Sequence, residues 1–216
     1  FHDIRGLINL MGGEQAFLNK LDAVFTTPPT FGGNVDTRKQ LIHEMREMQV
    51  VNMGQYAHGN QPIQHMIYLY NFAGQPWKTQ YWVREVMRRL YNPTPDGYCG
   101  DEDNGQTSAW YVMSSLGFYS VCPATDQYVL GAPLYKKAKV NLANGKTIEL
   151  TAPDNSDENR YVQSLKVNGK AYDKNYFTHD QLLRGVRLQY QMSNKPNKNR
   201  GIQASAYPYS FSDSNE

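Results

Sequence analysis

The sequence predicts an α+β protein in which helices over residues 1–125 precede a small antiparallel β module over residues 126–193. Two periodicities carry this prediction. Apolar residues recur at spacings of three and four in the first part, which is the period of a helix face. After Cys122-Pro123 they alternate with polar residues, which is the period of a strand. The remaining residues, 194–216, are rich in Ser, Asn and Lys and predict a polar tail.

Glycine- and proline-containing links divide the first part into several predicted helices. We expect them over residues 15–25, about 37–53, from Pro62 to Gly74 and from Pro76 onward, where Pro suits the first helical position. Short links between successive helices imply antiparallel neighbours. An α/α toroid or helix bundle fits this pattern.

The stretch Gly100–Trp110 places Asp101, Glu102 and Asp103 between two glycines and then turns apolar. Ala109, Val112, Met113 and Leu116 follow at helical spacing, so the acids lie on a loop that enters a helix. The positive end of the helix dipole favours ionised carboxylates there. A purely structural alternative is that Asp103 caps the helix.

A calcium loop of the EF-hand type is excluded for this stretch. That loop needs Gly at its sixth position and Glu at its twelfth. Counted from Asp101, those positions hold Gln106 and Val112.

The second part contains several short alternating segments. We expect strands over residues 128–130, 137–142, 146–150, 161–167, 172–177 and 186–192. Asn144-Gly145 is a strong hairpin signal between two of them. Asn168-Gly169-Lys170 marks a second turn.

Composition excludes some function classes. The 216 residues carry a formal charge of +2 and no basic stripe, which argues against nucleic-acid binding. No apolar run approaches the ~20 residues of a membrane span. The chain lacks a signal peptide and opens on Phe1-His2-Asp3 without Met, so we expect a fragment or a processed piece. Cys99 and Cys122 do not decide the redox compartment.

Several polar clusters fall on links that enter predicted helices, and such links gather at the rim of an α/α toroid. Each cluster also has a structural explanation, such as a turn, a cap or a surface pair. The clusters are His2-Asp3, His43-Glu44, His58–Pro62 with His65, Gln75–Lys78 and Asp101 with Asp103.

Long motifs in the chain are similar to one known family. They are His58-Gly59-Asn60-Gln61-Pro62, Tyr68–Asn71, Ala73–Gln80, Gly100–Tyr111, Leu116–Tyr119, Tyr128–Gly131 and Ala152–Ser156. On these motifs the chain resembles glycoside hydrolase family 92, the bacterial α-mannosidases, up to about Pro196. Two departures are visible, because many members have Glu where this chain has Gln61 and a second His where it has Gln64.

The resemblance implies a calcium-dependent, inverting exo-α-mannosidase that acts on mannose-containing glycans. It implies an (α/α)6 barrel with an N-terminal β-sandwich domain, and an active site between the two. This chain would then be the C-terminal part of the barrel plus its closing strands, without the β-sandwich. We expect the parent protein to be secreted or periplasmic.

The resemblance also implies roles for particular residues. The acids at Asp101 and Asp103 match the stretch that provides the general base, and His43-Glu44 matches a pair that contacts the leaving mannose in α-1,2-specific members. The general acid lies upstream of the match to His2-Asp3, outside this sequence. We further expect His2, Asp3, Trp77 and Lys78 to contact substrate, and Asn60 and Gln61 to bind Ca²⁺, whose ligands are oxygens.

Physical reasoning agrees with this division of roles. Inversion needs two carboxyl groups about 6.5–9.5 Å apart across the sugar, so two acids one residue apart cannot be both acid and base. We choose Asp103 as the base because it lies at the junction of loop and helix. Two alternatives stay open: a mannosyl-phosphodiester hydrolase, and a non-catalytic carbohydrate-binding module. The module would expose coplanar rings among Tyr128, Tyr135, Tyr161, Tyr172 and Tyr190.

Overall fold

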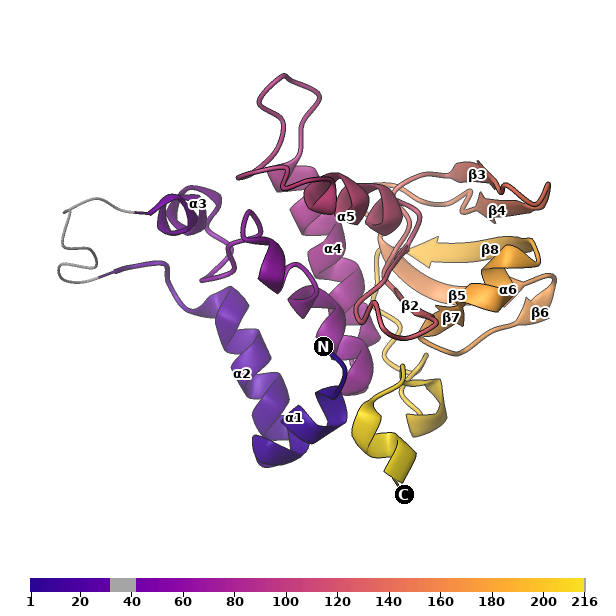
Figure 1. The fold of residues 1–216 in the computed structure, drawn as a ribbon, viewed down its shortest axis with the longest axis horizontal. Helices are drawn as coiled ribbons and strands as arrows, with labels where there is room; N and C mark the ends of the chain where they lie inside the picture. The colour runs from indigo at the N-terminus through magenta and orange to yellow at the C-terminus, as the bar shows by residue number, and fades with distance from the viewer. Residues whose placement is uncertain (32–41, 216) are drawn as a thin grey trace.

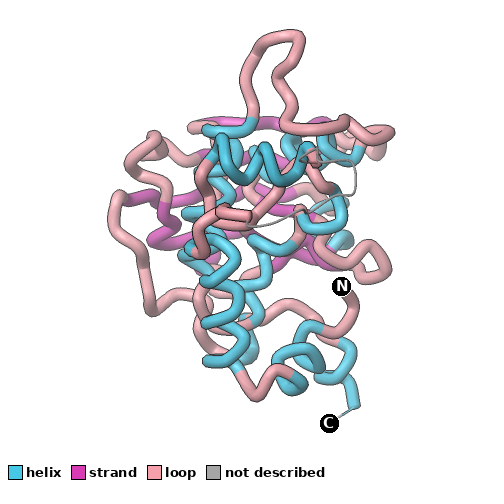
Figure 2. The backbone as a smooth tube through the Cα atoms, turned by 90° about the vertical axis from the view of Figure 1, so that its left-hand side faces the viewer, coloured by secondary structure: helices cyan, strands magenta, loops and turns pink. Residues whose placement is uncertain are grey.

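The structure, a computed structural model, describes residues 1–31 and 42–215. Helices form its first part and strands most of its second (Figure 1). The helical elements are α1 (Ile4–Leu10), α2 (Glu14–Thr26), α3 (His43–Val51), η1 (Gln61–Ile63), η2 (Met66–Phe72), α4 (Pro76–Leu90) and α5 (Gln106–Ser115). In Figure 2, which faces the helical side, the strands lie behind the helices.

Helices with a clear apolar face form where the sequence predicts them. In α2 the buried residues are Phe17, Leu18, Leu21 and Phe25. Phe25 stacks on Trp82 of α4, with ring centroids 4.4 Å apart. These contacts build a first hydrophobic core between the helices. The predicted helix over residues 37–53 begins at His43 in the described chain, and residues 37–41 lie outside the described residues.

The single helix expected from Pro62 to Gly74 is wrong. Two 3₁₀ helices, η1 and η2, replace it. Every residue from Ile67 to Phe72 is buried, so the segment has no polar face that an amphipathic helix would show. The side-chain amide of Asn71 donates to the carbonyls of Tyr68 and Leu130 and so ties this segment to the sheet behind it.

The strands form two sheets. In the smaller sheet, β2 (Gln127–Leu130) lies between β1 (Phe118–Tyr119) and β7 (Tyr176–Thr178). The larger sheet has the order β3 (Lys137–Asn141), β4 (Thr147–Thr151), β8 (Val186–Ser193), β5 (Tyr161–Val167), β6 (Lys170–Ala171). The short helix α6 (His179–Leu183) precedes β8.

The prediction of a purely antiparallel module is wrong at one position. Strands β4 and β8 pair in parallel, with Leu150 opposite Leu188. Both side chains are buried in the second hydrophobic core. Residues far apart in sequence make this pairing, so no turn signal announces it.

The helical and strand parts are firmly joined. Strand β1 lies before residue 125 and yet pairs with β2. The buried guanidinium of Arg84 on α4 donates to the carbonyl of Pro133 and to the side-chain oxygen of Asn155. A buried cation is stable only with such partners, so these bonds anchor α4 to the strands.

The segment expected as a polar tail returns to the helices. It contains η3 (Ala204–Ala206) and η4 (Phe211–Asn215), and it buries Arg200, Ala206 and Ser210. Cys99 and Cys122 are not joined by a disulfide. None of the helices within residues 1–31 and 42–215 has the length and apolar character that a membrane crossing requires.

Candidate active site

The acidic loop enters α5 as expected, but the N-cap residue is Gly105, which has no side chain to cap the helix. The Oε2 atom of Glu102 accepts the backbone N–H of Gly105, the N-cap residue, at 2.8 Å. Hydrogen bonds from Ser108 and Gly105 hold the pKa of the Glu102 carboxyl below its usual value. The alternative that Asp103 caps the helix is therefore wrong. The carboxylate that interacts with the start of α5 is that of Glu102.

Two consecutive left-handed residues explain the shift. Asp103 and Asn104 have φ values of +54° and +56°, which Asp and Asn tolerate better than most residues. The extra turn carries Glu102 back over the helix start. Asp101 and Asp103 stay exposed, and within the described chain neither carboxyl group makes a hydrogen bond. Both are free to bind a ligand or a water molecule.

A small network holds the backbone of Asp101. Its carbonyl accepts the side-chain N–H of Gln61 at 2.8 Å and the hydroxyl of Thr107 at 3.1 Å. Thr107 is completely buried, and its hydroxyl also accepts from Gln64 at 3.3 Å. Gln61 and Gln64 thereby join the segment around η1 to the acidic loop, which lies about 40 residues later in the sequence.

Two glycines let the loops approach each other. A Cβ atom on Gly59 would lie 2.7 Å from the carbonyl oxygen of Cys99, and one on Gly100 would lie 2.8 Å from that of Gly59. Real Cβ atoms do not approach so closely, so both positions require glycine. Gly100 also has φ of +81°, in the region that glycine favours.

Glu47 on α3 fixes the first of these loops. Both carboxylate oxygens accept the backbone N–H of Gly59 at 3.0 Å. Burial raises the pKa of Glu47, while the N–H groups of Gly59 and His58 oppose that rise. The helix is thus attached to the loop that carries Asn60 and Gln61.

Asp103 faces a hollow of about 540 Å³, which we call the acidic hollow. That volume is within the usual range for small-ligand sites. Gln106 donates to the hydroxyl of Tyr119 at 2.8 Å on its wall. Its lining residues are Phe1, Gln61, Pro62, His65, Asp103, Asn104, Gln106, Tyr119, Ser120, Val121 and Pro123.

His65 contributes a neutral imidazole to this hollow. Burial lowers the pKa of His65. Its Nδ1 atom lies 3.0 Å from the carbonyl oxygen of Pro62. A carbonyl only accepts, so Nδ1 carries the proton and Nε2 is left as an acceptor. That atom can receive a hydrogen bond from a sugar hydroxyl.

A second hollow of about 410 Å³ lies between α2 and α3. Glu44 and Asn60 both line it, together with apolar residues of α2 such as Val24. His43 is largely exposed and contacts Glu44, with Nε2 3.4 Å from Oε1. The structure therefore brings Glu44 close to Asn60, while Gln61 opens on the acidic hollow.

The calcium expectation can be compared with this geometry. Asn60 and Gln61 have amide oxygens of the kind that calcium accepts, but they line different hollows. Within the described residues, no group of three or more His, Cys, Asp or Glu side chains is placed to hold a metal. Calcium takes about six to eight oxygens, so the described residues alone do not form its site.

The remaining predicted site residues lie elsewhere. Asp3 caps α1 through Gly6 and accepts from Ser210 and Ser212, and these bonds hold its pKa far below the usual value. His2 is exposed beside it. Lys78, in the first turn of α4 next to Trp77, donates to Asp22 of α2 at 2.6 Å. None of these four lines either hollow.

His58 has a structural role. It is fully buried, and its two ring nitrogens lie 2.8 Å from the hydroxyls of Tyr56 and Tyr91. Burial lowers the pKa of His58 to about 3, so the ring stays neutral at ordinary pH.

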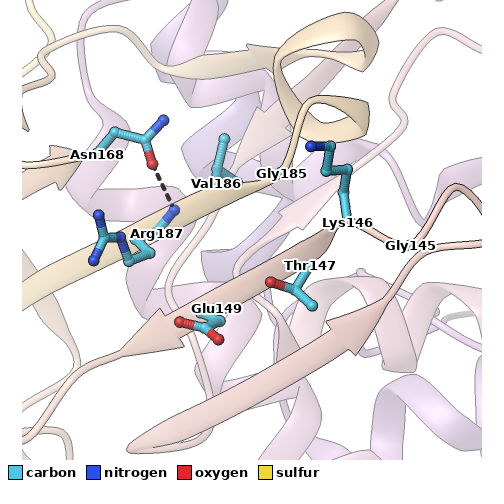
Figure 3. Close-up of a pocket in the computed structure, with 8 residues that line it drawn as sticks. All are labelled: Gly145, Lys146, Thr147, Glu149, Asn168, Gly185, Val186 and Arg187. Atoms are coloured by element: carbon cyan, nitrogen blue, oxygen red, sulfur yellow. Dashed lines mark hydrogen bonds between the residues drawn. The ribbon is translucent and has the colours of Figure 1, made fainter.

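The tyrosines of the alternative binding module do not share one exposed face. Tyr190 is buried in the second core, and Tyr172 packs on Phe177. Tyr135 is 47% exposed, and the hydroxyl of Tyr128 is bound to His179. A hollow of about 470 Å³ does lie on these strands, but its lining includes the charged side chains of Lys146, Glu149 and Arg187 and no aromatic ring (Figure 3).

Sequence reasoning missed two residues that shape the site. Thr107 follows Gln106 directly in the acidic motif, and its position there was the available signal. Glu47 lies one turn after His43 on α3, but its partner is a backbone N–H 12 residues away, which no spacing rule reveals.

The comparisons with known proteins agree with these motifs. Residues 1–194 match the family model described as the glycosyl hydrolase family 92 catalytic domain. An uncharacterized secreted glycosidase of Arthroderma benhamiae is 25% identical over 87% of this chain and 21% of its own length.

Solved structures of the family superimpose well. A family 92 inverting mannosidase from Bacteroides thetaiotaomicron is 51% identical, with a TM-score of 0.83 over 98% of this chain and 28% of that one. A family 92 α-mannosidase from the same organism, in complex with mannoimidazole, is 40% identical. Its TM-score is 0.86 over 97% of this chain and 26% of that one.

The chain therefore spans between about a fifth and three tenths of the relatives that it matches. The family model covers most of its residues, and the loops that carry the acids, the glycines and Gln61 lie within that match. This chain belongs to glycoside hydrolase family 92.

Proposed function

We propose that this chain supplies the general-base side of the active site of an inverting exo-α-mannosidase. The observation that carries the proposal is Asp103, an exposed carboxyl group with no hydrogen-bond partner in the described chain, on the wall of the acidic hollow. Membership of family 92 and the similarity to an inverting mannosidase support the reaction class.

In this proposal Asp103 takes a proton from a water molecule as that water attacks the anomeric carbon. Asp101 orients the water from the same loop, whose backbone Gln61 and Thr107 hold in position. The bond to the leaving oxygen breaks, and a general acid outside residues 1–216 protonates that oxygen. A base on one face of the sugar and an acid on the other give inversion.

The hollow also contains groups that suit a sugar. The Nε2 atom of His65 accepts a hydroxyl hydrogen, and the side chain of Gln106 is positioned by Tyr119. In the second hollow, Glu44 contacts the leaving mannose, as the family resemblance implies for the His43-Glu44 pair. Pyranose hydroxyls require several such convergent polar groups.

We also propose that the full-length enzyme, a longer polypeptide containing this chain, requires Ca²⁺ and an N-terminal β-sandwich domain. Asn60 or Gln61 would contribute one amide oxygen, with other ligands from the rest of the polypeptide. Such an enzyme would be secreted or periplasmic and would act in glycan degradation. The secreted glycosidase from Arthroderma benhamiae supports that location.

Hydrolysis of mannosyl phosphodiesters is the second candidate within the family. Phosphate is a good leaving group and needs little help from a general acid, so that candidate depends on residues outside this chain. None of the described residues favours it over the mannosidase.

The test is hydrolysis of α-1,2-mannobiose by the full-length enzyme, followed by proton NMR of the first product. We expect β-mannose as the initial anomer. Residues 1–216 alone should show no measurable turnover, because loss of a general acid costs about 10²–10⁴-fold before positioning is considered. Retention of the α-anomer, or turnover by residues 1–216 alone, would contradict the proposal.

A further inference from the structure

We infer that the tyrosine-lined hollow beside the acidic loop is an accessory binding site for mannose-containing polysaccharide. This tyrosine hollow has a volume of about 480 Å³ and is distinct from the acidic hollow. Its lining residues are Tyr91, Asn92, Pro93, Thr94, Pro95, Gly97, Tyr98 and Tyr111. The inference rests on the proposed function for the choice of polysaccharide.

The hollow is built on a loop that its own hydrogen bonds stabilise. The loop projects from the molecule between α4 and α5 (Figure 1). The N–H of Asn92 donates to the carbonyl of Gly97 at 3.1 Å, and the N–H of Gly97 donates to the carbonyl of Thr94 at 3.0 Å. A Cβ on Gly97 would lie 2.0 Å from the carbonyl oxygen of Asn92, so only glycine closes this turn.

Three tyrosine rings give the hollow its chemical character. Tyr91 packs edge-on against Tyr98, with centroids 5.8 Å apart, and is tilted against Tyr111 at 4.8 Å. Tyr98 is 45% exposed, although burying such a ring would be favourable. Tyr91 is fixed from behind by the stacked, fully buried ring of Trp110. The exposed ring therefore stands on a rigid aromatic support.

The lining of the hollow suits a neutral ligand. None of its eight lining residues is charged. The hydroxyls of Tyr91 and Tyr98 bind His58 and Ser108, and the hydroxyl of Thr94 binds Asn92 and Asp96 of the same loop. The exposed surface of the hollow is therefore mainly that of its rings, and a pyranose has C–H faces that pack on such rings. The hollow in Figure 3 is the opposite case, with charged side chains and no ring.

The position of the hollow connects it to the proposed reaction. The hydroxyl of Tyr98 lies 2.8 Å from that of Ser108, in the first turn of α5. Ser108 also hydrogen-bonds Glu102 at the start of the same helix. Only Cys99 and Gly100 separate Tyr98 from Asp101 in sequence. A polysaccharide held at Tyr98 would keep chain ends close to the acidic loop.

The test uses the full-length enzyme in native gels with and without soluble α-mannan. Tyr98→Ala should weaken retardation by the mannan about three- to tenfold, as expected for loss of one ring contact. Tyr98→Phe keeps the ring and should keep the retardation. Gel retardation measures binding and needs no turnover. It therefore tests the accessory site separately from the proposed mannosidase activity.

Two control variants and one kinetic measurement accompany this test. Arg187→Ala changes an exposed residue of the hollow in Figure 3 and should leave retardation unchanged. Ser108→Ala removes the Tyr98 partner without removing the ring and should also bind normally. For Tyr98→Ala, KM on mannan should rise while kcat on an aryl α-mannoside stays the same.

Equal retardation of Tyr98→Ala and wild type would overturn the inference. So would equal losses in Tyr98→Ala and Arg187→Ala, because the effect would then be non-specific. If the tyrosine hollow is covered by another segment of the full-length enzyme, wild type and variant would migrate alike, which is also a negative result.

Discussion

The side chain of Gln61 donates a 2.8 Å hydrogen bond to the backbone carbonyl of Asp101. This bond joins η1 to the acidic loop. The hydroxyl of Thr107 binds the same carbonyl from the first turn of α5. Two different segments, η1 and the first turn of α5, therefore hold the backbone of Asp101 in place.

Loss of the Gln61 side chain should loosen the acidic loop. Gln61→Met keeps the length of the side chain but removes the donor, so it should cost about 0.5–1.5 kcal/mol of stability. In the full-length enzyme kcat should fall about tenfold or more, since small misplacements of catalytic groups are expensive. The matched control is Gln163→Met, which removes a similar bond to the carbonyl of Lys195 on the β module. Unchanged kcat in Gln61→Met would show that the bond does not position the acids.

Glu47 should make stability depend on pH in a defined direction. Burial raises the folded-state pKa of Glu47 above its ordinary value of 4.5. Its contribution is therefore fully present below about pH 4.5 and declines as pH rises through the folded pKa. The Tm difference between Glu47→Gln and wild type should shift in favour of the variant from pH 4 to pH 7.

The control for this measurement is Glu158→Gln, which changes an exposed carboxyl group of the same type. A Tm difference for Glu47→Gln that moves against the variant as pH rises would mean that the N–H bonds from Gly59 outweigh burial.

The sequence predicted the parts of this molecule that local patterns determine. Phe17, Leu18, Leu21 and Phe25 form one face, and α2 follows from that face alone. The acidic loop and its entry into α5 were also predicted, because Gly105 and the apolar spacing after it are local signals.

What the sequence could not predict depends on distant contacts. Leu150 and Leu188 meet in a parallel pair that only the folded core determines. Gly105 and not Asp103 is the N-cap of α5, because Asp103 and Asn104 both adopt left-handed backbone angles, which their residue types permit but do not require. Neither hollow is lined by His2, Asp3, Trp77 or Lys78. Their expected contacts with substrate stay predictions.

The proposed leaving-group contact gives a prediction about linkage. Glu44→Ala in the full-length enzyme should slow hydrolysis of α-1,2-mannobiose far more than that of an aryl α-mannoside. The aryl group is a good leaving group and makes few of the contacts that mannose makes. Arg46→Ala, an exposed change on the same helix, is the control. An equal loss of hydrolysis rate on both substrates would show that Glu44 does not contact the leaving group.

Metal dependence is a separate prediction. Exhaustive chelation of the full-length enzyme should abolish hydrolysis of an α-mannoside, and added Ca²⁺ should restore it. Titration of residues 1–216 with Ca²⁺ should show only weak binding, because the amides of Asn60 and Gln61 open on different hollows. Unchanged activity after chelation would contradict the proposal that the enzyme requires Ca²⁺.

The base assignment is tested most directly by kcat and Tm of Asp103→Asn in the full-length enzyme. Asn tolerates the left-handed backbone at this position, so Tm should stay at the wild-type value while kcat falls about 10²–10⁴-fold. The matched control Glu102→Gln weakens the bond to Gly105, so its Tm should fall while kcat stays near wild type. Wild-type kcat in Asp103→Asn would contradict the account.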